Sequence, residues 1–170
     1  MNTTTVKFHS LPGNRVKTYS VAALFVLGNI VLSQLCHLLP QGGATLLPIY
    51  FFTLAAAYKY GWRAGLLTAL ASPLVNAALF GMPAAAALPV ILVKSVLLAL
   101  TAAWAAARWQ RCTIALLAAV VIAYQVAGGL FEWAWTGSFA AALQDFRLGF
   151  AGMLLQVAGG WLVINRLLNR

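Results

Sequence analysis

Six long apolar segments are the feature that most limits what this chain can fold into. A helix needs about 20 apolar residues to cross the hydrocarbon core of a bilayer. Segments that reach or approach this length cover residues 18–39, 45–60, 62–80, 88–108, 112–135 and 146–168. Because 63% of the 170 residues are hydrophobic and only 8% are charged, little of the chain is left for a soluble domain. The sequence therefore predicts an all-α integral membrane protein with six transmembrane helices.

The positive charges predict how these helices are oriented. Nine of the eleven Lys and Arg residues fall on one side of the predicted bundle, namely Lys7, Arg15, Lys17, Lys59, Arg63, Arg108, Arg111, Arg166 and Arg170. Arg147 falls on the other side, and Lys94 lies within a helix. By the positive-inside rule, both termini are expected to be cytoplasmic. Residues 1–17 would form a cytoplasmic tail, and 18–170 a single domain in a bacterial cytoplasmic membrane.

The net charge of +9 is therefore explained by topology, and no nucleic-acid partner is expected. The chain contains no phosphate-binding glycine loop, no Ser/His/Asp set and no metal-ligand spacing. Cys36 and Cys112 are expected near opposite membrane faces, which makes a disulfide between them improbable. These absences disfavour an enzyme, a cofactor and a metal site, and they favour a transporter or a binding subunit.

Lys94 is the most unusual residue of the predicted helices. A cation inside a bilayer is costly and generally faces a cavity or a partner. The chain has only two acidic residues, Glu132 and Asp145. Lys94 and Glu132 are expected either to form a structural ion pair or to share one ligand. In the second case Lys94 binds a carboxylate or phosphate of the ligand, and Glu132 binds a donor.

Strongly polar residues gather towards the outer ends of the predicted helices, or near their middle, and they predict a pocket open to the outside. Trp133 is added as an aromatic wall for a flat ligand. The simpler interpretation of Asp145 and Arg147 is a polar cluster at a helix end. The candidate substrate-binding residues are Lys94, Asn76, Gln125, Glu132, Trp133, Arg147, Gln156 and His37.

Two stretches resemble a known family. Residues 70–83 (LASPLVNAALFGMP) and 88–94 (LPVILVK) are similar to the S components of energy-coupling factor (ECF) vitamin transporters. Members often carry a pattern of the form lsPllsfLltGMPplapLPimlpEl. Residues 58–65 (YKYGWRAG) resemble the glycine-bounded second connection of that family. The six helices, the length and the cytoplasmic termini agree with it across the whole chain.

The resemblance implies a small membrane protein that captures a vitamin or related micronutrient outside and delivers it inward by toppling. Its partners would be a transmembrane coupling protein, two cytoplasmic ATPases and the lipid bilayer. Many relatives have glutamate at the position of Lys94, which inverts the charge of the site, so no relative's ligand is carried over. Lys94 itself predicts an anionic substrate, and Trp133 predicts a partly flat one. The first helix lacks the clear Ala-xxx-Ala pattern by which many S components meet the coupling protein.

Two other functions fit the same sequence. A standalone secondary carrier would use Glu132 or Asp145 for proton coupling. A membrane chaperone or structural subunit would bind no small ligand.

Overall fold

The structure, a computed structural model, describes residues 15–168, and within this range it contains helices and no strand. Five of these helices are long and apolar enough to cross a membrane, as a multi-pass membrane protein requires. They are α1 (Arg15–His37), α4 (Trp62–Phe80), α5 (Leu88–Trp109), α6 (Ile114–Thr136) and α9 (Phe150–Leu162), which continues into η2 (Val163–Leu167). The all-α prediction is thus confirmed for the described residues. Nearly all of the expected tail at 1–17 lies outside them.

The second apolar segment corrects one expectation. Instead of one helix over 45–60, it forms α2 (Gly42–Leu46), η1 (Pro48–Tyr50) and α3 (Phe51–Tyr60). The break lies at Leu47, whose backbone is left-handed with φ 46° and ψ 48°. Pro48 explains the break, because a proline clashes with an α-helical conformation of the residue before it.

A buried asparagine stabilises the start of α3. The backbone N–H of Phe52 donates to Asn29 Oδ1 at 3.0 Å, which satisfies one of the amides that a helix start leaves unpaired. Asn29 Nδ2 donates in turn to Thr53 Oγ1 and Ser72 Oγ, both at 3.0 Å. The side chain of Asn29 thereby links α1 to the start of α3 and to the middle of α4.

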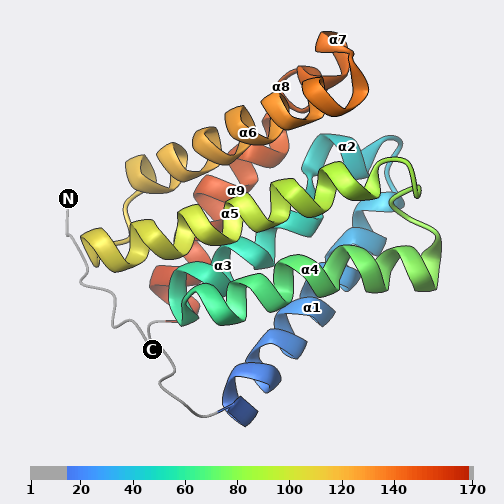
Figure 1. The fold of residues 1–170 in the computed structure, drawn as a ribbon. Coiled ribbons are helices and arrows are strands. Elements are labelled where there is room, and N and C mark those ends of the chain that lie inside the picture. Colours follow the sequence, from blue (N-terminus) through green and yellow to red (C-terminus); the bar gives the residue numbers. More distant parts are fainter. Residues whose placement is uncertain (1–14, 169–170) are drawn as a thin grey trace.

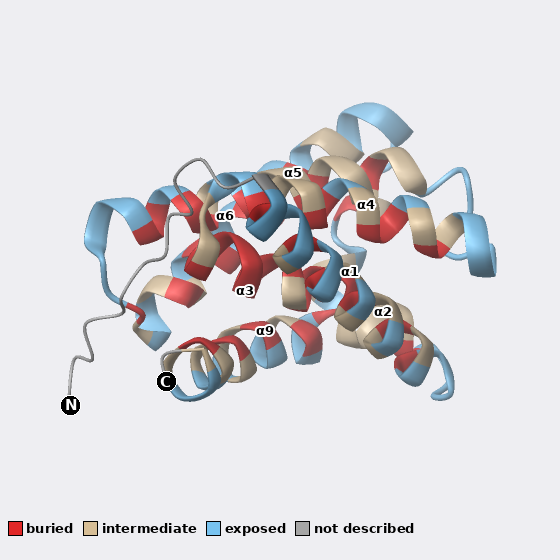
Figure 2. Cartoon of the chain, turned by 90° about the horizontal axis from the view of Figure 1, so that it is seen from below, coloured by how far each residue is buried: buried red, intermediate tan, exposed pale blue. Residues whose placement is uncertain are grey.

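Helix α3 is the centre of the bundle. It contacts α1, α4, α5 and α9, and Figure 2 shows it as a mostly buried helix between its neighbours. Leu54, Tyr58 and the alanines between them are fully buried. Non-helical backbone at membrane depth is tolerated where protein covers it. The broken second segment occupies such a place, whereas α1 has many exposed leucines and valines along its length.

The helices end in two groups, which we call the basic end and the pocket end (Figure 1). The basic end comprises Gly61, the connection 110–113 and the end of η2. Its charged residues are Lys59, Arg63, Arg108, Arg111 and Arg166. Gly61 joins α3 to α4 in a single residue with φ 87°, a conformation that other residues rarely adopt.

The pocket end comprises the connections 38–41, 81–87 and 137–149. The last of these contains the short helices α7 (Phe139–Ala142) and α8 (Gln144–Arg147), so the final long helix begins at Phe150 rather than at residue 146. Segment 42–60 leads from this end, where α1 finishes, to the basic end, where α4 begins (Figure 1). Cys36 and Cys112 are both buried. They lie at opposite ends of the bundle and are not joined by a disulfide, as expected.

Candidate functional site

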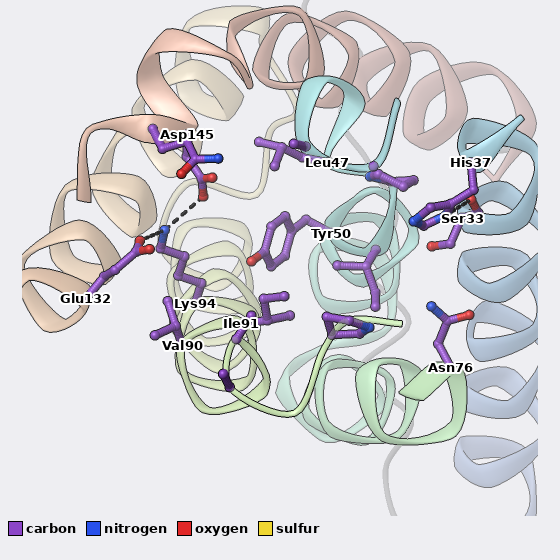
Figure 3. Close-up of a pocket in the computed structure, with 18 of the residues that line it drawn as sticks. Ser33, His37, Leu47, Tyr50, Asn76, Val90, Ile91, Lys94, Glu132 and Asp145 are labelled. Carbon is purple, nitrogen blue, oxygen red and sulfur yellow. Dashed lines mark hydrogen bonds and ion pairs between the residues drawn. The ribbon is translucent and has the colours of Figure 1, made fainter. Parts of the chain in front are cut away.

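A cavity of about 510 Å³ lies at the pocket end, where the sequence predicts a pocket. Its walls come from α1, the broken segment α2–η1, the end of α4, the connection 81–87, the first turns of α5, the end of α6 and α8. Figure 3 shows side chains from all of these elements around it. The polar residues that line it are Ser33, His37, Tyr50, Asn76, Lys94, Glu132, Thr136, Gln144 and Asp145.

Lys94 forms two ion pairs at one side of this cavity. Its Nζ lies 2.5 Å from Glu132 Oε2 and 2.8 Å from Asp145 Oδ2. The Lys94 side chain is 2% exposed, while the two carboxylate side chains are 18% and 22% exposed. We call Lys94, Glu132 and Asp145 the charge triad. It joins α5, α6 and α8, and all three side chains line the cavity (Figure 3), the two carboxylates being more exposed than the cation.

The position of Lys94 depends on a glycine of the neighbouring helix. A Cβ added at Gly128 would overlap the aliphatic stem of Lys94, starting at Cγ. The absence of a side chain at Gly128 therefore lets Lys94 lie flat against α6. Glu132 follows one helical turn later on the same face, where it meets the ammonium group.

The opposite wall of the cavity is uncharged and polar. His37 Nδ1 lies 2.6 Å from the Ser33 carbonyl oxygen, so that ring nitrogen carries the proton and donates. Asn76 Nδ2 donates to the Met82 carbonyl at 2.7 Å, which ties the connection 81–87 to α4. Gln34 donates to Asn76 Oδ1 at 2.9 Å. The Ser33 hydroxyl is buried and has no hydrogen-bond partner.

Tyr50 lies between these two walls in Figure 3, with its hydroxyl towards Lys94. It is the last residue of η1, and its ring packs against Tyr124 with centroids 5.5 Å apart. The break at Leu47 and Pro48 thus places an aromatic side chain at the cavity that a continuous helix would orient differently.

Four of the eight candidate residues line the cavity: Lys94, Asn76, Glu132 and His37. The other four do not. Gln125 and Gln156 are buried in the bundle, where Gln156 accepts a hydrogen bond from Tyr124 at 2.9 Å and both amide atoms of Gln125 lack a partner. Trp133 is 48% exposed and packs on Phe139, and Arg147 is exposed.

Depth explains why Gln125 does not reach the cavity, and direction explains why Trp133 does not. Gln125 is seven residues before Glu132, or about 10 Å along a helix that rises 1.5 Å per residue. Helical periodicity places Gln125 and Glu132 on one face of α6, but it does not predict how deep the cavity extends along that face. Trp133 follows Glu132 directly and therefore points about 100° away from it.

The sequence-based set omitted Asp145, Tyr50 and Ser33. Asp145 had a usable signal, since it is one of only two acids that a buried lysine can pair with. Tyr50 had a weaker signal in Pro48, which separates it from the helix before it. Nothing in the sequence distinguishes Ser33 from serines that stabilise helix packing.

Comparison of the chain with protein-family models, with curated proteins and with solved structures finds no match in any of the three. Within residues 15–168, no group of three His, Cys, Asp or Glu side chains is arranged to hold a metal ion. What the arrangement offers chemically is a half-enclosed cavity with fixed charges on one wall and hydrogen-bonding groups on the other.

Proposed function

We propose that this chain is the substrate-binding integral membrane subunit, or S component, of an ECF-type importer. The observation that carries this proposal is the cavity of about 510 Å³ at the pocket end. Ligand sites for small molecules typically have volumes of 300–1,000 Å³, mostly apolar walls and a few polar groups. A vitamin-sized micronutrient fits such a space. The resemblance of residues 70–83 and 88–94 to S components supports the same function.

The proposed topology has six crossings, with the segment 42–60 as a broken second crossing buried inside the bundle. Both termini and the basic end then face the cytoplasm, which agrees with the positive-inside rule. The cavity opens on the outer face of a bacterial cytoplasmic membrane. Transport would be driven by two ATPases on other chains, joined through a coupling protein, and the chain itself would not be an enzyme.

Two measurements test this proposal. Mass spectrometry of the purified protein should identify a small molecule that is retained through purification. Co-expression with an ECF coupling protein and its two ATPases should give a stable complex that takes up this molecule only when ATP is hydrolysed. A complex that forms without uptake, together with a protein that retains no ligand, would instead support a chaperone or structural role.

One feature of the site favours a second candidate, a proton-coupled carrier. Two carboxylates, those of Glu132 and Asp145, share one lysine at the cavity, and acidic residues inside membrane proteins commonly form the proton relays of pumps and transporters. Such a carrier would transport in liposomes without any ATPase and would respond to an imposed proton gradient. Uptake that strictly requires the ATPase complex excludes it.

A further inference from the structure

We infer that the ligand of this cavity is a small organic cation whose positively charged group carries N–H donors and binds between Glu132 and Asp145. This inference rests on the proposed binding function and adds the charge class of the ligand. It reverses the sign expected from the sequence, where Lys94 was assigned to an anionic group of the ligand.

The charges at the cavity wall are not balanced. Of the described residues that line it, one is a cation, Lys94, and two are anions, Glu132 and Asp145. The triad therefore has a net charge of one negative unit when all three groups are ionised. An uncompensated charge is costly where burial limits its contact with water, and a bound monovalent cation would cancel it.

Among residues 15–168, no other Lys, Arg, Asp or Glu lines the cavity. Arg147, the basic residue closest in sequence to the triad, is exposed and does not line the cavity. His37 lines the opposite wall, where its Nδ1–H donates to the Ser33 carbonyl. A neutral imidazole satisfies this contact, so the geometry does not require a charge on His37.

Lys94 is poorly placed to bind an anionic ligand. Two of its three N–H groups already donate to carboxylates, at 2.5 and 2.8 Å, and its side chain is 2% exposed. An incoming carboxylate or phosphate would have to approach two fixed carboxylates of the same sign. Like charges in contact in a low-dielectric site repel strongly.

The carboxylates, by contrast, have acceptor capacity left. Lys94 occupies one oxygen of each, and no group within residues 15–168 donates to Glu132 Oε1 or Asp145 Oδ1. Both side chains are about one-fifth exposed and line the cavity. A ligand ammonium or amidinium can donate to both free oxygens, and hydrogen bonds to ionised acceptors are the strong ones.

An independent observation is a residue of the cavity wall whose buried hydroxyl has no hydrogen-bond partner. Ser33 is one of the residues at the wall opposite the triad and is only 1% exposed, yet its buried Oγ has no partner. A buried polar group without a partner destabilises a protein. A ligand that extends from the triad to this wall (Figure 3) would satisfy the hydroxyl once the Ser33 side chain turns towards the cavity, and it would need a polar group at its far end.

The test uses three probes that share an indole ring and differ in the charge of the side chain: tryptamine, tryptophol and indoleacetate. Their dissociation constants for the purified full-length protein in detergent are measured by equilibrium dialysis at neutral pH. We expect tryptamine to bind about tenfold more tightly than tryptophol, since a charge-assisted bond replaces a neutral one. Indoleacetate should bind most weakly.

Matched variants locate the effect. Glu132→Gln keeps the volume and removes one negative charge, so it should weaken tryptamine binding about tenfold and leave tryptophol binding unchanged. Asp145→Asn should act in the same direction and serves if the first variant fails to fold. Arg147→Gln removes a charge that does not line the cavity and should change neither affinity.

Two results would overturn the inference. Tightest binding of indoleacetate would show that the site prefers anions, while the proposed binding function would survive. Equal binding of all three probes, or binding of none, would also reject a cation site. The proposed binding function is tested separately. It would be contradicted if the purified protein retained no small molecule and the ATPase complex imported none.

Discussion

At the scale of single residues, the energetics of this chain centre on Lys94. Its two ion pairs account for both acidic residues of the sequence, and they join three separate elements at the pocket end. Breaking a buried ion pair by removing one partner costs about 3–5 kcal/mol, because the remaining charge stays buried without compensation. The triad is thus a stability determinant as well as a candidate binding site.

Lys94→Met should therefore lower the stability of the protein by about 3 kcal/mol, because two neighbouring carboxylates lose their shared cation. The measurement is the apparent melting temperature in detergent. The triple variant Lys94→Met, Glu132→Gln, Asp145→Asn removes every charge and should recover most of the loss. A triple variant no more stable than the single one would contradict this account.

Gly128→Ala should destabilise the protein by about 1–3 kcal/mol, the usual cost of overpacking, because the new methyl group overlaps the stem of Lys94. The neighbouring variant Gly129→Ala is the control. Its Cβ would lie 3.3 Å from the Ala142 carbonyl oxygen, a tight contact that a small shift relieves. Thermal unfolding in detergent should rank Gly128→Ala clearly below Gly129→Ala.

At the scale of elements, the turn between α5 and α6 at the basic end has an unusual backbone conformation. The turn between α5 and α6 places Gln110 in a left-handed conformation with φ 49°, and its side chain is exposed. Glycine adopts this conformation without steric cost. We expect Gln110→Gly to stabilise the protein by about 0.5 kcal/mol, after its larger loss of chain entropy is included. Gln110→Val should destabilise it, and a higher melting temperature for Val than for Gly would contradict the assigned backbone.

The long helices could be predicted from the sequence because each is a long apolar segment, and glycine or proline marks several of their ends. Trp62–Phe80 lies between two glycines and matches the structure at both ends, and α5 starts at the expected Leu88-Pro89. The helix over 45–60 was predicted wrongly because its apolar continuity outweighed Pro48. The break is tolerated because the segment is covered by protein and because Asn29 accepts a hydrogen bond from the backbone N–H of Phe52. Neither feature can be recognised without the fold.

The candidate site was predictable only in part for the same reason. Lys94 and Glu132 lie on long helices, so their relative depth follows from the topology. Asp145 reaches Lys94 only because α7 and α8 turn the chain back over the cavity, and two four-residue helices leave no periodic pattern in the sequence. Serine and tyrosine occur throughout membrane bundles, so Ser33 and Tyr50 needed the cavity itself to be recognised.

At the scale of the whole molecule, the proposed orientation can be tested by labelling cysteines in spheroplasts. An impermeant maleimide should label Ala140→Cys, at an exposed position of α7, in intact spheroplasts. It should label Gln110→Cys, at the basic end, only after permeabilisation. The reverse pattern would mean that the basic end faces outward.

The unmodified protein is the control for this labelling. Cys36 and Cys112 are both 5% exposed, and burial raises the pKa of the Cys112 thiol to about 12. The thiolate that reacts with maleimide is therefore scarce at neutral pH. We expect the parent protein to remain unlabelled on both sides of the membrane.

In the proposed transport cycle, the unequal triad would also couple occupancy to the membrane voltage. Moving one elementary charge across a membrane costs or yields about 2.3 kcal/mol per 100 mV. In a cell whose interior is negative, an empty cavity with one excess negative charge would be carried inward against the field. A monovalent cation in the cavity cancels that charge, so inward movement of the loaded cavity would be insensitive to voltage. The field would thus discriminate between empty and occupied protein, and would oppose a cycle in which nothing is carried.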